Sequence, residues 1–221
     1  MDPLDQGIRY PPNRVRDALH RVLFGLVAAP GPGFQDWVLR HFFERLYRRP
    51  NPWSYEGSPY QNYKCGQALA RIPNNAYGRV LEVGCGEGAF SERLLAERDV
   101  REFIGVDISA RAIARAKSRC YRYENARFDA DNIFSARLPA AFDLIVVCEV
   151  LYYLGGSAPD LAALLTPKLS PGGRLLLVHL WPEAEQLHRA FLASDDLSVL
   201  DELVDQHSVR PFCVSLLGRG S

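Results

Sequence analysis

The sequence predicts an α/β fold built on a doubly wound, parallel sheet. From residue 79 onward, short apolar segments alternate with helical patterns, which is the signature of successive βαβ units. The segments at 142–148 and 174–180 are apolar almost throughout, as expected for strands covered on both faces. Ligands of such sheets bind beyond the carboxyl ends of the strands, so candidate site residues are sought there.

Composition restricts the classes of function. The chain has 221 residues, a formal net charge of zero and 48% hydrophobic residues, enough for one domain and a small appendage. Neutral charge gives no general attraction to nucleic acid or membranes, so we expect no membrane partner and consider nucleic acid an unlikely one. Five cysteines without CxxC spacing indicate reduced thiols in a cytoplasmic protein, and no metal site is expected.

Residues 1–72 are predicted to form a helical extension or lid, and residues 73–221 the cofactor-binding domain. Helical patterns occur at 15–28, 34–48 and 60–72. Prolines after residue 48 and at Pro73 end the second and third of these helices. The apolar face of the 34–48 helix suits a lid, a core element or an interface.

The remaining elements follow in order. Ser109 is a suitable N-cap for the second helix after the glycine-rich loop. Strands are expected at 79–83, 102–106, 126–128, 142–148, 174–180, 197–204 and 209–216, and helices at 88–98, 109–123, 160–169 and 183–193.

The stretch VLEVGCGEGAF, residues 80–90, carries the most specific signal. Gly84 and Gly86, with Cys85 between them, allow a tight turn and close approach of a ligand, and the following helix offers unpaired N–H groups. Dinucleotide-binding enzymes share this loop type. Glu82 separates the two cases, because a carboxylate there repels a pyrophosphate and suits the positive groups of S-adenosylmethionine (SAM). We therefore predict SAM as the cofactor.

Two further strand ends complete the predicted cofactor site. Asp107, followed by Ile108, lies about 20 residues past the glycines, where an acidic residue binds ribose hydroxyls. The segment FDADNI follows the third strand, and its Asp131 or Asn132 can accept a hydrogen bond from the adenine amine. The sequence does not choose between these two.

The fourth strand runs into Cys148 and Glu149, which we expect beneath the transferred methyl group. Glu149 is the candidate to orient an incoming amine or accept its proton, with a non-catalytic carboxylate as the alternative. Tyr152 and Tyr153 are predicted to close the acceptor pocket, although core packing is an equally common role for such rings.

His179 and Trp181 follow the fifth strand. A histidine at that strand end can serve as a base, or it can be part of the hydrogen-bonded interior. Trp181 is placed in the acceptor pocket with the other predicted aromatic residues.

The segment at 51–65 is rich in aromatic residues and precedes the first strand. Trp53 and Tyr55 are predicted to line the acceptor pocket if the N-terminal helices cover the cleft, and Tyr60 to lie nearer the cofactor. Lys64 offers a positive charge for the methionine carboxylate of SAM. Packing of the helix onto the sheet is the alternative.

Arg111, Arg115 and Arg119 recur at intervals of four residues and share one helix face. A solvated helix face is the simpler interpretation, and an RNA-contacting stripe is the alternative.

The motifs VLEVGCGEG, GVDIS, FDLIVVCEVLYYL and LSPGGRLLLVH, in this order, resemble those of class I SAM-dependent methyltransferases. The NPWSYEGSPYQNYK segment and EVLYYL resemble the nodulation-protein-S type, which N-methylates the free amine of a deacetylated chitooligosaccharide. The resemblance implies a Rossmann-like sheet of seven strands, the last antiparallel. It also implies that Gly84, Gly86 and Asp107 bind SAM, and that Tyr60 or Lys64 approaches its amino-acid end.

The predicted function is therefore transfer of a methyl group from SAM to an amine of a small molecule, an amino sugar or oligosaccharide. The resemblance covers residues 50–180, so the regions that shape the acceptor pocket lie partly outside it. Alternatives are O-methylation of a natural product with His179 as base, and methylation of RNA or protein through the Arg111 face. Two further alternatives are a dinucleotide-dependent dehydrogenase and a SAM-binding module without catalytic activity.

Overall fold

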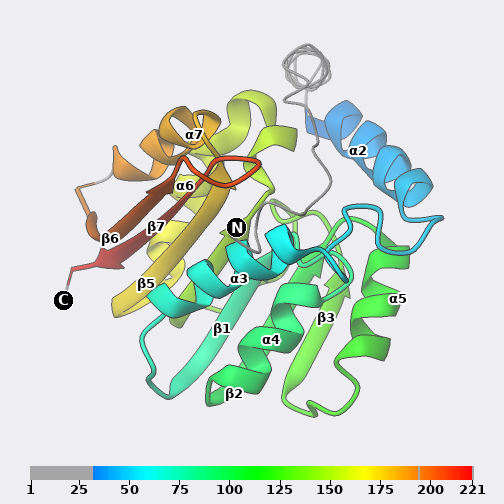
Figure 1. Cartoon of the computed structure of the whole chain (residues 1–221), viewed down its shortest axis with the longest axis horizontal. Coiled ribbons are helices and arrows are strands. Elements are labelled where there is room, and N and C mark those ends of the chain that lie inside the picture. The colour runs from blue at the N-terminus through cyan, green and yellow to red at the C-terminus, as the bar shows by residue number, and fades with distance from the viewer. Residues whose placement is uncertain (1–31, 194, 221) are drawn as a thin grey trace.

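A seven-stranded sheet with the order β3-β2-β1-β4-β5-β7-β6 forms the middle layer of the molecule (Figure 1). The computed structural model describes residues 32–193 and 195–220, so the predicted helix at 15–28 lies outside the described residues. The strands are β1 (Tyr77–Val83), β2 (Val100–Asp107), β3 (Ala126–Ala130), β4 (Phe142–Cys148), β5 (Leu169–Leu180), β6 (Leu197–Asp205) and β7 (Phe212–Arg219).

Strand directions confirm the predicted fold class. Strands β3, β2, β1, β4 and β5 pair in parallel, and β7 is antiparallel to both β5 and β6. Val83 pairs with Val106 of β2 and Val147 of β4, so three strands end at almost the same level. The loops that follow these strands therefore meet at one edge of the sheet.

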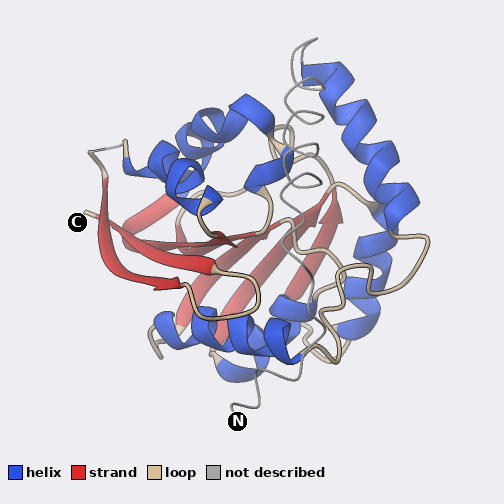
Figure 2. Ribbon diagram, turned by 45° about the horizontal axis from the view of Figure 1, so that its top comes forward, coloured by secondary structure: helices blue, strands red, loops and turns tan. Residues whose placement is uncertain are grey.

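Helices cover both faces of the sheet (Figure 2). They are α2 (Pro32–Leu46), α3 (Pro59–Arg71), α4 (Ala89–Glu97), α5 (Ala110–Arg119), α6 (Ala158–Leu165) and α7 (Glu183–Leu192). Val80 packs with α3, α4 and α5, whereas its neighbour Leu81 packs on the opposite face with α6 and α7. Both side chains are fully buried, which stabilises the fold by ~1.5–3 kcal/mol each.

The two N-terminal helices lie in different places. Helix α3 packs on the sheet, and its Ala68, Leu69 and Ile72 join the same hydrophobic cluster as β1 and β7. Helix α2 lies beyond the carboxyl ends of the strands (Figure 1). The division of the chain at residue 72 stays a prediction.

Local sequence explains where the helices begin. The Ser58 hydroxyl accepts a hydrogen bond from the Gln61 N–H at 3.3 Å, and Pro59 occupies the first turn of α3. Ser109 caps α5 as predicted, accepting from the Ala112 N–H at 3.3 Å. Helix α5 ends at Arg119, earlier than the predicted residue 123.

Two strand starts differ from the prediction by three residues or more. Strand β5 includes the LSPGG segment, which was expected to be a turn, and pairs with β4 across a register shift between Phe142 and Leu144. Strand β7 begins at Phe212 rather than at residue 209, because Pro211 lacks the N–H needed for pairing. Residues 206–211 therefore form a turn at the same edge as the cofactor loop.

Candidate cofactor and acceptor site

A cavity of about 1230 Å³ lies at the carboxyl edge of the sheet. Its walls come from α2, the 51–61 segment, the glycine-rich loop and the ends of β2, β4 and β5. Pockets for single ligands are typically about 300–1,000 Å³, so this one has room for a nucleotide-sized cofactor together with an acceptor.

The glycine-rich loop forms one end of the cavity. Gly84 and Gly86 adopt φ values of 69° and 54°, a conformation that side chains disfavour. A Cβ atom at Gly84 would lie 2.2 Å from Cγ2 of Val150. The N–H groups of Gly84 and Cys85 donate to the Val106 carbonyl at 2.7 and 3.1 Å, which holds the loop against β2.

Asp107 connects the loop to helix α5. Its Oδ2 accepts a hydrogen bond from the Gly86 N–H and its Oδ1 from the Ser109 N–H, both at 2.9 Å. Burial raises the pKa of Asp107 to about 6, so the group is a carboxylate at neutral pH and can accept further hydrogen bonds. Ile108 beside it also lines the cavity.

Glu82 lies buried beneath the glycine-rich loop, with 2% of its surface exposed. The Ser91 hydroxyl donates to Glu82 Oε2 at 2.5 Å. Burial raises the pKa of Glu82 to about 8, so this carboxyl is protonated at pH 7. A ligand cation close to it favours the ionised form.

Asp131 and Asn132 both line the cavity, and their hydrogen bonds distinguish them. The Asn132 Nδ2 group donates to Asp36 Oδ1 of α2 at 2.8 Å, and its Oδ1 accepts from the Phe134 N–H. Asp131 uses its Oδ1 within the loop, for Asn132 N–H and the Ser135 hydroxyl. Among the described residues Oδ2 of Asp131 has no partner, which leaves it available to a ligand.

Glu149 lies where β4 ends, next to Cys148, and both line the cavity. Its backbone has φ 58°, which costs a non-glycine residue ~1–2 kcal/mol. The Glu149 N–H donates to the Val178 carbonyl at 2.9 Å, and its carboxylate pairs with Lys64 of α3. Strained backbone of this kind concentrates at functional sites, which supports a role for the Glu149 carboxylate.

Aromatic side chains form the other end of the cavity. The Tyr153 ring meets Phe43 of α2 edge-on at a centroid distance of 4.9 Å and lies 6.4 Å from Trp53. The Tyr152 hydroxyl accepts a hydrogen bond from the Leu180 N–H. Tyr55 and Tyr60 line the same cavity. The structure thus places Trp53, Tyr55, Tyr152 and Tyr153, predicted for the acceptor, and Tyr60, predicted for the cofactor, in one cavity with Glu149.

His179 is not part of the cavity. It is fully buried, and burial together with the nearby His188 holds the pKa of His179 well below its usual value. The Leu151 N–H donates to His179 Nε2 at 3.3 Å, which places the ring proton on Nδ1, 2.9 Å from His188 Nε2. The prediction that His179 faces the cleft as a base is therefore wrong in this structure.

Trp181 is also not part of the cavity wall, although Leu180 before it and Glu183 shortly after it both line the cavity. Its N–H donates to the Pro211 carbonyl at 2.9 Å. The structure thus gives Trp181 a part in holding the 206–211 turn rather than a place in the acceptor pocket.

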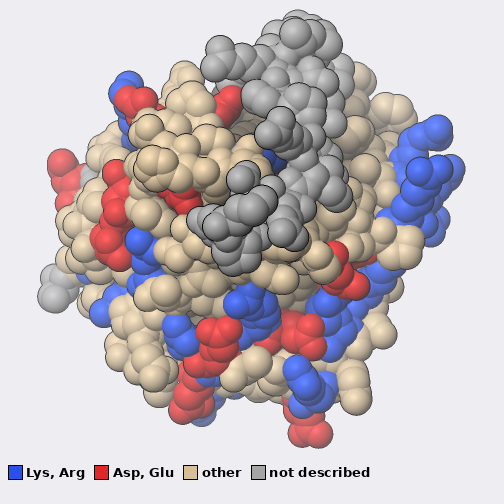
Figure 3. Space-filling model, viewed as in Figure 1, with Lys and Arg blue, Asp and Glu red and all other residues tan. Residues whose placement is uncertain are grey.

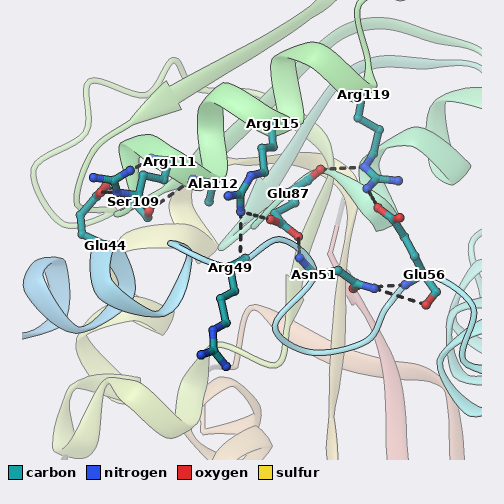
Figure 4. Close-up of polar contacts among 10 residues, drawn as sticks. All are labelled: Glu44, Arg49, Asn51, Glu56, Glu87, Ser109, Arg111, Ala112, Arg115 and Arg119. Carbon is teal, nitrogen blue, oxygen red and sulfur yellow. Dashed lines mark hydrogen bonds and ion pairs between the residues drawn. The ribbon is translucent and has the colours of Figure 1, made fainter.

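The arginines of α5 are neither an open RNA-binding stripe nor a simple solvated face (Figure 4). Arg111 pairs with Glu44 of α2 at 2.9 Å. Arg115 pairs with Glu87 of the glycine-rich loop, and its guanidinium also donates to a backbone carbonyl in the segment after α2. Arg119 pairs with Glu56. These contacts fasten α2 and the 49–56 segment to the cofactor loop.

Surface charge agrees with this pairing. Figure 3 shows basic and acidic side chains next to one another over α4 and α5.

Within residues 32–193 and 195–220, no group of three or more His, Cys, Asp or Glu side chains is arranged to hold a metal ion. No helix in the same ranges has the length and apolarity to cross a membrane.

Sequence reasoning missed part of the cavity wall. Tyr47, directly after α2, is 5% exposed, and its hydroxyl would lie 3.0 Å from a Cβ atom at Gly86. Its helical spacing in the sequence does not distinguish a core residue from a site residue. Arg210 was assigned to a strand that starts three residues too early. Further wall residues without a sequence signal are Gln35, Leu39, Phe42, Gln61, Ile133 and Asp160.

The model of the nodulation protein S (NodS) family matches residues 38–169. The chain belongs to the NodS family. It is 33% identical over 129 residues to nodulation protein S of Rhizobium tropici, covering 57% of this chain and 53% of that protein. For nodulation protein S of Sinorhizobium fredii the identity is 30% over 139 residues, with 62% and 63% covered. The chain therefore spans about half to five-eighths of the length of these NodS relatives.

A solved NodS structure shares the fold. It is the N-methyltransferase NodS from Bradyrhizobium japonicum WM9 in complex with S-adenosyl-L-homocysteine, with a TM-score of 0.75 and 24% identity. The match covers 83% of this chain and 99% of that chain. The seven-stranded Rossmann-like architecture expected from the motifs is thus confirmed.

Proposed function

We propose that the protein is a SAM-dependent methyltransferase that methylates an amine of a small molecule, an amino sugar or oligosaccharide. The observation that carries the proposal is the single cavity that joins the glycine-rich loop, Glu82 and Asp107 to Glu149 and its aromatic neighbours. Membership of the NodS family supports the proposal, since a structurally similar NodS protein is an N-methyltransferase that binds S-adenosyl-L-homocysteine.

The cofactor half is proposed to hold SAM through polar groups of known position. The Asp107 carboxylate accepts from the ribose hydroxyls, and Oδ2 of Asp131 accepts from the adenine amine, in preference to Asn132. Glu82 lies near the positive groups of the methionine end. Lys64 and Tyr60 line the same cavity, so they remain candidates for the methionine carboxylate.

When bound, SAM supplies a methyl group on a positively charged sulfur that is a good leaving group. The proposed reaction forms a bond from the amine nitrogen to the methyl carbon and breaks the carbon–sulfur bond, with its electron pair moving to sulfur. The nitrogen then loses a proton. Alignment of the two reactants and exclusion of water are the main tasks of such a site.

Glu149 is proposed to orient the amine, because it lines the same cavity as the glycine-rich loop, Tyr152 and Tyr153. The aromatic wall excludes water and offers ring faces to the positive charge that the nitrogen gains as the methyl group is transferred. O-methylation is disfavoured, since His179, the base assigned to it, is buried outside the cavity.

Mass spectrometry of the purified protein with SAM and glucosamine oligomers tests this function. We expect a product one methyl group heavier, with the methyl group on nitrogen, and loss of most activity in Glu149→Gln. Glu185→Gln is the matched control, because Glu185 is an exposed carboxylate paired with Arg189 on α7. A methyl group found on oxygen, or activity retained in Glu149→Gln, contradicts the proposal. The cytoplasmic location stays a prediction.

A further inference from the structure

Arg210 is a cavity-wall residue held by a fixed turn between β6 and β7. The Ser208 hydroxyl donates to the Arg210 carbonyl at 2.9 Å. Asp205 Oδ1 accepts from the N–H groups of His207 and Ser208 at 2.9 and 3.0 Å. The turn lies at the edge of the sheet where the cofactor loop lies (Figure 1), so the guanidinium is presented to the cavity from an ordered backbone.

The charges of the cavity wall single out Arg210. Lys64 pairs with Glu149 at 3.1 Å, and Arg119 pairs with Glu56 and, at 3.5 Å, Glu92. Among the described residues, the Arg210 guanidinium has neither an acidic partner nor a hydrogen-bond acceptor. A planar guanidinium without a protein partner is suited to bind a carboxylate or phosphate through two parallel hydrogen bonds.

Tyr60 provides a second donor in the same part of the cavity. Its hydroxyl is buried and has no hydrogen-bond partner, although such groups are costly to leave unpaired. Burial raises the pKa of Tyr60 to about 12, a rise opposed by the charge of Lys64 and less strongly by that of Arg210. The Tyr60 ring also packs edge-on against Phe212, two residues after Arg210, at a centroid distance of 6.2 Å. The Tyr60 hydroxyl therefore keeps its proton and can donate to a ligand oxygen near Arg210.

The topology places this pair on the acceptor side. Phe212, two residues after Arg210, pairs with Leu180 at the end of β5. Strand β5 lies beyond β4 from β1, so the turn is separated from the glycine-rich loop by the end of β4 and by Glu149. A ligand group at Arg210 is thus on the opposite side of Glu149 from the ribose site at Asp107.

We propose that Arg210, assisted by Tyr60, is an oxyanion subsite for the acceptor, so that the preferred acceptor is an amine that also carries a carboxylate or a phosphate. The inference rests on the proposed function, because it assigns the second half of the cavity to an amine substrate. The other source of an oxyanion is the methionine carboxylate of the cofactor, and the experiment separates the two.

The test is calorimetric titration of glucosamine 6-phosphate and of glucosamine into protein saturated with S-adenosylhomocysteine. We expect at least ~10-fold tighter binding of the phosphate sugar, the range for hydrogen bonds to charged groups. Arg210→Gln should reduce that preference to within about twofold, Arg210→Lys should retain part of it, and Tyr60→Phe should weaken it. Arg189→Gln, an exposed arginine of α7, is the control and keeps the preference.

The outcomes are distinct. Equal binding of the two sugars, or binding of neither, overturns the inference. If Arg210→Gln weakens S-adenosylhomocysteine and leaves the sugar preference intact, Arg210 binds the cofactor and the inference is wrong. Because binding is measured without transfer, a preference that depends on Arg210 supports the subsite even if methyl transfer fails. Methyl transfer without a preference for the phosphate sugar rejects the oxyanion subsite but not the proposed methyltransferase function.

Discussion

Lys64 Nζ lies 3.1 Å from Glu149 Oε1, and this ion pair joins helix α3 to the end of strand β4 in the middle of the cavity. Burial is the largest single influence and lowers the pKa of Lys64, but the Glu149 carboxylate and the neighbouring Tyr60 and Cys148 together leave that pKa raised. Lys64 therefore stays charged at neutral pH. We place this pair between the proposed cofactor and acceptor halves of the cavity. It holds the carboxylate of Glu149, whose backbone is strained.

Glu149→Gln should lower the free energy of unfolding, because it leaves the Lys64 ammonium, 4% exposed, without its countercharge. We expect a loss of about 2–3 kcal/mol, below the value for fully buried pairs since Glu149 is partly exposed. Urea denaturation measures it. In the double variant Lys64→Met/Glu149→Gln stability should recover while methyl transfer does not. Full stability of the single variant would show that the pair contributes little.

Binding of S-adenosylhomocysteine should release a proton at pH 7. Burial raises the pKa of Glu82 to about 8, and the ammonium of the ligand favours the ionised carboxylate. Affinity should therefore rise between pH 6.5 and 8. Calorimetry in phosphate and Tris buffers, which differ in ionisation enthalpy, measures the release. Glu82→Gln should bind about tenfold more weakly and release no proton, whereas buffer-independent enthalpy in the wild type would refute the assignment.

Glu82 should also make the ligand-free protein less stable as pH rises. Its pKa is raised from 4.5 to about 8, so between these values the folded state holds a proton that the unfolded state has lost. Stability from this group is complete below pH 4.5 and is lost as pH rises through 8. Urea midpoints across that window should fall in the wild type and fall less in Glu82→Gln. Parallel curves would argue against a buried, protonated Glu82.

Arg115→Gln should weaken cofactor binding, although Arg115 itself does not line the cavity. The Arg115 guanidinium holds Glu87 of the glycine-rich loop, and Glu87 Oε2 accepts the Asn51 N–H at 2.8 Å. A partly exposed pair of this kind contributes up to ~1 kcal/mol, so we expect about a fivefold higher Kd for S-adenosylhomocysteine. Arg127→Gln, which removes an exposed pair with Asp129, is the control. Equal effects of the two variants would exclude a specific role for Arg115.

Most of the sheet could be predicted, because its central strands are buried on both faces and leave apolar runs that helical segments interrupt. The placement of Glu82, Asp107 and Glu149 followed from the same logic, since parallel strands end at one edge. Residues whose roles depend on long-range packing were not predictable. His179 ends a strand as expected, but its partner His188 comes from α7 and holds the ring inside the core.

Helix α2 and Arg210 illustrate the same limit. The apolar spacing of α2 predicts a buried face, but not that Leu39 lines the cavity or that Tyr47, directly after the helix, lies against Gly86 of the cofactor loop. The residue pattern predicts a strand that includes Arg210, whereas Pro211, which lacks a backbone N–H, delays the start of β7 to Phe212. Contacts between segments far apart in the chain decide both cases.

Calorimetric titration of the full chain with S-adenosylhomocysteine, and separately with NADH, tests the central claim that this cavity binds SAM. We predict one-to-one binding of S-adenosylhomocysteine in the micromolar range and none of NADH, because the ligand ammonium favours ionisation of the buried Glu82, whereas the negative charge of a pyrophosphate opposes it. Binding of NADH, or of neither compound, would contradict the account.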